Sequence, residues 1–171
     1  YKTPLYKNDE GLCVYEEPQK DKVYCICVDT ARGQGKDYSA FVVIDMTTTP
    51  YRLVAIYRNN EIAPMMYPNA VNAVGKQYNN AHVLVEINDI GGQVADILHS
   101  ELEYENILMT SVKGRKGQVL GGGFGKGGSQ FGLRTTSVTK RVGCAALKSL
   151  IEEDKLIIED FNTVNELTSF I

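Results

Sequence analysis

The stretch VYCICVDTARGQGKDYSAFVVID, from Val23 to Asp45, contains two apolar runs separated by a short glycine-containing turn. The first run has the length and composition of a buried strand, and it ends on a carboxylate, Asp29. A second acid, Asp37, lies in the turn before the second strand, residues 39–45. A carboxylate at the end of a buried strand is costly unless another group pairs with it. The stretch therefore predicts two paired strands that present Asp29 to a partner group.

The remaining pattern predicts an alternation of strands and helices. A third strand is expected at 51–58, a helix at 65–78, a fourth strand at 82–87 and a helix at 93–102. Further along, the pattern favours a strand at 107–111, a helix at 138–154, a strand at 155–159 and a helix from 162 onward. Three short-linked strands followed by alternating helices and strands predict an α/β protein with a mixed β-sheet flanked by helices. This is the element order of the ribonuclease H-like fold.

Composition indicates one domain of ordinary globular character. The chain has 171 residues, of which 43% are hydrophobic and 23% are charged. Residues 1–22 are polar and are interpreted as an irregular N-terminal arm, with the domain proper at 23–171 and a glycine-rich basic insert at 113–136. No apolar run approaches the roughly 18 residues of a membrane helix, so no membrane partner is expected. The four cysteines are expected to be reduced core residues, with Cys25 and Cys27 on one strand face.

Charge is strongly segregated along the sequence. Residues 106–151 contain eight basic residues and no acidic one, so the rest of the chain, with ten of the 18 basic and all 21 acidic residues, has a net charge of −11. Such segregation predicts a surface that faces a polyanion. The alternative is a solvated face beside a flexible loop. The eight residues are Lys113, Arg115, Lys116, Lys126, Arg134, Lys140, Arg141 and Lys148.

Two acids are expected to meet at one edge of the sheet. In the predicted topology the first and fourth strands are parallel neighbours, so Asp29 and Glu86 end side by side. Adjacent carboxylates repel unless a cation neutralises them, and oxygen ligands select hard ions such as Mg²⁺ or Mn²⁺. Asp37 is either a further metal ligand or a turn residue. The simpler alternatives are that Asp29 caps its turn and that Glu86 forms a structural salt bridge.

Three sequence blocks resemble one family of proteins. The blocks VDTARGQGKDYSAFVVID, VLVEINDIGGQVADIL and TKRVGCAALKSLIEEDKLII, within residues 12–171, resemble the C-terminal nuclease domain of the large terminase subunit of T-even-type tailed bacteriophages. The resemblance implies an endonuclease that cuts concatemeric viral DNA by metal-dependent phosphodiester hydrolysis, using two Mg²⁺ or Mn²⁺ ions. It also implies a location in the host cytoplasm during viral assembly. Partners would be double-stranded DNA, the terminase ATPase domain, the small terminase subunit and the procapsid portal.

The resemblance also assigns roles to residues by position. Asp29 and Glu86 match the first-strand and fourth-strand catalytic acids, Asp37 matches an acid often found near the metal, and Lys140 falls in a basic block that contacts phosphate. The third catalytic Asp of the family is expected beyond Ile171, which makes the domain C-terminally incomplete. The DNA-binding residues expected are Arg32, Lys113, Arg115, Lys116, Lys126, Arg134, Lys140 and Arg141.

Other interpretations stay open at this stage. A resolvase or transposase of the same fold would use a different third acid. An actin-like or sugar-kinase-like ATPase needs a phosphate-binding Gly and Thr or Ser soon after the first Asp, and residues 30–33 (TARG) fit this poorly. A non-catalytic module that docks to DNA or to the procapsid would use the basic segment alone. Binding of a divalent metal separates this last class from the nucleases.

Overall fold

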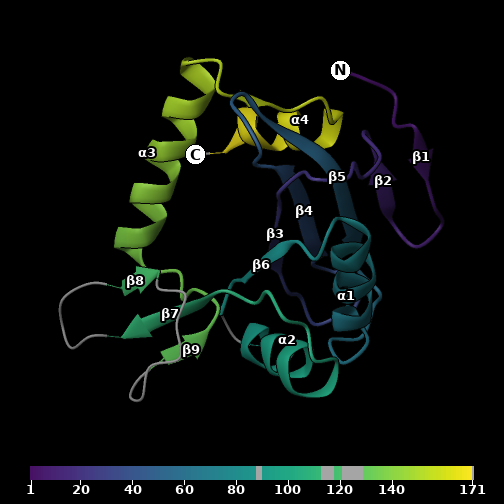
Figure 1. The fold of residues 1–171 in the computed structure, drawn as a ribbon, viewed down its shortest axis with the longest axis vertical. Helices are drawn as coiled ribbons and strands as arrows, with labels where there is room; N and C mark the ends of the chain where they lie inside the picture. The colour runs from purple at the N-terminus through teal and green to yellow at the C-terminus, as the bar shows by residue number, and fades with distance from the viewer. Residues whose placement is uncertain (88–89, 113–117, 121–128, 171) are drawn as a thin grey trace.

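The computed structural model describes residues 1–87, 90–112, 118–120 and 129–170 of the chain (Figure 1). At its centre is a mixed sheet in which β3 (Tyr24–Asp29), β4 (Ser39–Asp45) and β5 (Tyr51–Asn59) form an antiparallel meander. The next strand, β6 (His82–Val85), pairs parallel to β3. The expected parallel neighbours are therefore confirmed, and so is the ribonuclease H-like mixed sheet.

The first 22 residues contribute more structure than the sequence predicted. They contain two short strands, β1 (Tyr6–Lys7) and β2 (Leu12–Val14), and β2 pairs antiparallel with β5. The sheet order is β1-β2-β5-β4-β3-β6, and β10 (Leu156–Ile157) adds to β5 in parallel. Two- and three-residue strands carry too little alternation to be recognised in a sequence. The segment expected to be irregular is thus part of the sheet.

Helices cover the sheet and extend beyond it. The first two, α1 (Tyr67–Gln77) and α2 (Gly91–Asp96), supply buried side chains to the core, and α2 continues as a π-helical segment, η1 (Ile97–Glu101). The two C-terminal helices are α3 (Ser137–Glu152) and α4 (Phe161–Ser169), and neither has a buried residue. None of the helices in the described part of the chain is both long and apolar enough to cross a bilayer.

Alternation along β3 separates a core face from an open face. Ile26 and Val28 are buried in the cluster formed with α1 and α2. The intervening side chains, Cys25, Cys27 and Asp29, belong to the opposite face, and Cys27 and Asp29 are exposed. The prediction that these cysteines are core residues is wrong for Cys27, because the strand alternation places it on the open face. All four cysteines are free thiols, as expected.

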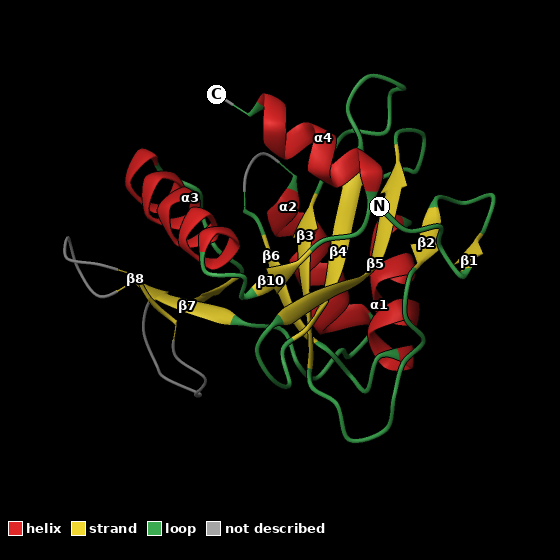
Figure 2. Cartoon of the chain, turned by 90° about the horizontal axis from the view of Figure 1, so that it is seen from above, coloured by secondary structure: helices red, strands yellow, loops and turns green. Residues whose placement is uncertain are grey.

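A second, three-stranded sheet stands beside the N-terminal end of α3 (Figures 1 and 2). Its order is β8 (Gln118–Leu120), β7 (Met109–Val112) and β9 (Ser129–Phe131), all antiparallel. The predicted fifth strand at 107–111 follows the main sheet only at its start, where the Leu108 N–H donates to the Val83 carbonyl at 2.9 Å. It then leaves the edge and becomes β7. Within the glycine-rich insert, the described residues 118–120 and 129–131 form two strands, and each pairs with β7.

Candidate active site

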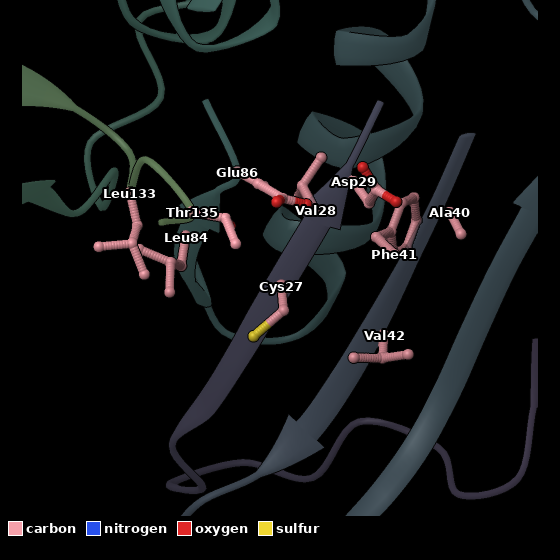
Figure 3. A pocket seen from close by; sticks show the side chains of 10 residues that line it. All are labelled: Cys27, Val28, Asp29, Ala40, Phe41, Val42, Leu84, Glu86, Leu133 and Thr135. Carbon is pink, nitrogen blue, oxygen red and sulfur yellow. The ribbon is translucent and has the colours of Figure 1, made fainter. Parts of the chain in front are cut away.

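The parallel register of β3 and β6 brings two acids together. Val28 pairs with Val85, so the next positions along the two strands are Asp29 and Glu86. The Glu86 N–H continues the ladder by donating to the Val28 carbonyl at 2.9 Å. Figure 3 shows both acids at the carboxyl end of β3, on the edge of a cleft. The structure thus brings together the two acids that the sequence paired.

The cleft has a volume of about 380 Å³ and lies over the open face of β3, β4 and β6. Cys27, Val42 and Leu84 make its floor largely apolar, and the two acids provide its charge. Leu133 and Thr135, from the segment after β9, form a further wall (Figure 3). An apolar cleft with a few converging polar groups is the usual form of a ligand or active site.

The two carboxyl groups interact electrostatically. Burial raises the pKa of Asp29 above its ordinary value, and the negative charge of Glu86 and a hydrogen bond between the two carboxyl groups raise it further. The Thr30 backbone N–H acts in the opposite direction by hydrogen-bonding the ionised form of Asp29. Proximity of two carboxylates opposes ionisation of both, so a cation between them would be favoured. This repulsion is the physical reason to consider a metal here.

Tyr67 of α1 supports the end of β3 from the core side. Its hydroxyl donates to the backbone carbonyl of Asp29 at 3.1 Å, and the ring is fully buried. Burial, followed by the charge of Asp29, raises the pKa of Tyr67, so the hydroxyl stays protonated and available as a donor at neutral pH. The end of β3 is therefore held by β4, β6 and α1 together.

A second hollow joins the cleft to the first turns of α3. It has a volume of about 240 Å³ and shares Leu133 and Thr135 with the cleft, and it is also lined by Thr139 and Lys140. The Lys140 ammonium lies 5.3 Å from the centroid of the Phe170 ring. The helix begins with a capping box in which Thr136 and Thr139 exchange side-chain-to-backbone hydrogen bonds. Lys140 therefore stands on a well-defined helix end beside the acid cleft.

Other predicted site residues are less closely associated. Asp37 is exposed in the turn before β4 and does not line the cleft. Arg32, Arg134 and Arg141 are exposed on the surface. Among the described residues, no group of three His, Cys, Asp or Glu side chains is arranged to hold a metal. Lys113, Arg115, Lys116 and Lys126 lie outside the described residues.

Leu133 and Thr135 were not recognised as site residues from the sequence. Leu133 reaches the acid pair because its N–H donates to the Val85 carbonyl and its carbonyl accepts from the Ile87 N–H, both at 2.8 Å. This pairing joins segments separated by about fifty residues. No local pattern around RTTSVTK signals it, although the threonines before an apolar helix do indicate a cap.

Two adjacent acids at the ends of parallel strands, on a mixed sheet of this order, define a ribonuclease H-like domain of nuclease type. A family model described as the terminase RNaseH-like domain matches residues 26–171. The chain therefore belongs to the family of terminase RNaseH-like domains, the nuclease domains of phage large terminases.

Solved structures agree with this fold. The large terminase nuclease of the thermophilic phage G20c with bound magnesium superposes with a TM-score of 0.66 at 19% identity, covering 93% of this chain and 69% of that chain. The zinc-bound form of the same nuclease gives 0.69 at 19% identity, covering 97% and 81%. The large terminase nuclease domain of Thermus phage P74-26 gives 0.63 at 19% identity, covering 95% and 70%.

Proposed function

We propose that this chain is the metal-dependent endonuclease domain of a DNA-packaging terminase, and that its parent protein is of the T-even type. The observation that carries the activity is the pairing of Asp29 and Glu86 in one cleft at the ends of β3 and β6. The T-even assignment rests on the three sequence blocks quoted above. The large terminase nuclease of phage G20c has been solved with magnesium, with cobalt and with zinc, which supports use of a divalent ion here.

The residues present fit one hard divalent ion, Mg²⁺ or Mn²⁺. Magnesium takes one or two carboxylates from a protein and keeps the remaining positions for water and phosphate. Asp29 and Glu86 supply two carboxylates whose mutual repulsion such an ion would relieve. When bound, the ion would lower the pKa of a water molecule and stabilise negative charge on the phosphodiester. A second ion would need further ligands, and we propose Asp37 and the third acid that the family resemblance implies for that role.

The substrate we propose is the backbone of double-stranded DNA. Lys140 and the exposed Arg134 and Arg141 lie on the same segment that forms the wall of the acid cleft. A phosphate bound near Lys140 would place the neighbouring phosphodiester along the hollow that leads to Asp29. Such contacts position the backbone without reading bases. We extend the same role to Arg32, Lys113, Arg115, Lys116 and Lys126.

We propose that the domain acts together with the terminase ATPase domain, the small terminase subunit and the procapsid portal. The activity would be exerted in the host cytoplasm during viral assembly, where concatemeric genomes are cut to length.

A plasmid-nicking assay tests the proposed activity. Supercoiled DNA is incubated with the protein and Mg²⁺ or Mn²⁺, and relaxed and linear forms are quantified. We expect nicking by the full parent protein, which supplies the third acid, and we expect it to be lost when Asp29→Asn or Glu86→Gln is introduced into that protein. The conversion should be lower by about 10³-fold, the usual scale for losing a group that stabilises the transition state. DNA binding without metal-dependent cleavage by the full parent protein would favour a docking module instead.

A further inference from the structure

Two cysteines lie on the open face of β3, in line with Asp29. Cys25 and Cys27 are two residues apart in the strand, so their side chains leave the same face. Cys27 is exposed and lines the acid cleft, two residues before Asp29, whereas Cys25 is half-buried behind it. Figure 3 shows the Cys27 sulfur over the cleft floor, away from the two carboxyl groups.

The spacing of this pair opposes a disulfide but permits a bridging atom. Residues two apart in a strand are separated by about 6.6–6.8 Å along the chain. That separation lies at the upper limit of the about 4.4–6.8 Å found between the Cα atoms of disulfide-bonded cysteines, so direct bonding of the sulfurs would strain β3. A central atom bonded to both sulfurs extends the reach of the pair without moving the backbone. Both thiols are free, so both can serve as ligands.

We propose that Cys25 and Cys27 form a dithiol site for a soft, thiophilic centre that takes two sulfur ligands from the protein, of which a trivalent arsenical is the best-defined example. Thiolates prefer soft centres, whereas the neighbouring carboxylates prefer hard cations. No third His, Cys, Asp or Glu among the described residues completes a larger ligand group, which suits a centre that needs two sulfurs. The open face of β3 thus carries a thiol site for a soft centre and, next along the strand, a carboxylate site for a hard cation.

The reaction with phenylarsine oxide is balanced without an oxidant or a reductant. Each thiol sulfur forms one bond to arsenic, and the arsenic–oxygen bond breaks. The oxygen leaves as water and takes both thiol protons, while arsenic stays trivalent. The phenyl group remains on the arsenic above the cleft floor beside Leu84 and Val42, which line the same cleft. A group of this size would obstruct the approach of a DNA backbone to Asp29.

Intact-protein mass spectrometry with phenylarsine oxide tests this site directly. We expect one phenylarsenic adduct on the wild-type protein that survives excess monothiol and is removed by a small dithiol. Cys25→Ser and Cys27→Ser should each weaken the apparent affinity at least about 100-fold, because the second bond is intramolecular. The matched control is a Cys13→Ser, Cys144→Ser double variant, which keeps the pair and should bind like the wild type.

The outcomes separate this proposal from the nuclease. No dithiol-reversible adduct on the wild-type protein, or an adduct that persists equally in either single variant, would overturn it. Loss of the adduct in the Cys13, Cys144 double variant would also overturn it, because the site would then lie elsewhere. Cys25→Ala and Cys27→Ala provide a second pair of variants if a serine variant does not fold. The mass measurement needs no metal and no cleavage, so it is unaffected by failure of the proposed nuclease activity.

Discussion

The hydroxyl of Tyr15 donates a 2.5 Å hydrogen bond to the carboxylate of Asp160, joining the segment after β2 to the start of α4 across 145 residues. Both side chains are buried. The other oxygen of Asp160 accepts from the N–H and the hydroxyl of Thr163, which makes Asp160 the N-cap of α4. Burial alone would raise the pKa of Asp160, but these hydrogen bonds hold it below the ordinary value. The N-terminal segment therefore anchors the C-terminal helix.

Tyr15→Phe should destabilise the protein by about 1.5–3 kcal/mol, the usual value for a hydrogen bond to a charged group. The substitution removes only the hydroxyl and leaves Asp160 buried with one fewer donor. Urea unfolding measures the change in free energy. The matched control is Tyr51→Phe, a tyrosine only partly buried in β5. Equal stability of Tyr15→Phe and wild type would show that the contact does not anchor α4.

Asp29→Asn should make the metal-free protein equally or more stable at pH 7. The folded-state pKa of Asp29 is raised, so the folded protein holds this proton more tightly than the unfolded chain. Its contribution to stability is present below the unfolded pKa of about 3.9 and is lost as pH rises through the folded pKa. The ionised acid is therefore a cost at neutral pH that Asn removes.

Melting temperatures at pH 7 and below pH 4, without divalent metal, test the predicted direction of this change in stability. The gain in melting temperature of Asp29→Asn over the wild type should shrink at the lower pH, where the wild-type acid is protonated. Asp37→Asn, at an exposed acid outside the cleft, is the control and should show no such pH dependence. A variant that melts lower than wild type at pH 7 would mean that Asp29 stabilises the fold.

Gly132→Ala should disturb the strand end that carries Glu86. Gly132 has a φ of +86°, and a Cβ there would lie 2.4 Å from the Val85 carbonyl oxygen and 2.7 Å from the Ile87 side chain. Left-handed strain of roughly 1–2 kcal/mol adds to a steric term of about 1–3 kcal/mol. Gly35→Ala is the control, since φ there is +76° and nothing lies within 4 Å of the added Cβ.

Thermal unfolding of the two glycine variants separates strain from steric overlap. Gly35→Ala should show the strain alone, and Gly132→Ala should lose clearly more stability. Comparable losses in the two variants would show that the segment after β9 can move away from β6, and Leu133 would then not be a fixed wall of the cleft.

DNA binding should depend on salt through the basic residues near the cleft. Replacing Arg134, Lys140 and Arg141 together with Gln should reduce the magnitude of the slope of log K against log salt by about 2–3, since each phosphate contact contributes about 0.9 to that slope. Fluorescence anisotropy with duplexes of different sequence measures the slope and should show no sequence preference.

A control triple variant removes the same charge elsewhere. Lys7, Lys20 and Lys76 are exposed, and none of them lines the cleft or the adjoining hollow. Their replacement with Gln should leave the slope close to that of the wild type. Equal slopes for the two triple variants would mean that only net charge matters and that α3 does not position DNA.

The strand and helix pattern was predictable where elements were long and periodic. Apolar runs of strand length predict β3, β4 and β5. The parallel pairing of β3 and β6 then places the two acids side by side at the carboxyl ends of these strands. The three residues of β2 are too few to show alternation, so their place in the sheet was missed. Asp37 was ambiguous because a turn acid can point either toward a site or into solvent. Leu133 and Thr135 depend on a distant pairing that no local pattern contains.

The central claim is that Asp29 and Glu86 together hold a divalent cation. Isothermal titration calorimetry with Mn²⁺, on the wild-type protein and on Asp29→Asn, Glu86→Gln and Asp37→Asn, tests it most directly. We expect Mn²⁺ affinity to fall at least about tenfold in each of the first two variants, the lower end of the loss expected when the groups around a metal are altered. Asp37→Asn should leave the ion held by Asp29 and Glu86 in place, because Asp37 is proposed only for a second ion. Unchanged Mn²⁺ affinity in both Asp29→Asn and Glu86→Gln would contradict the account.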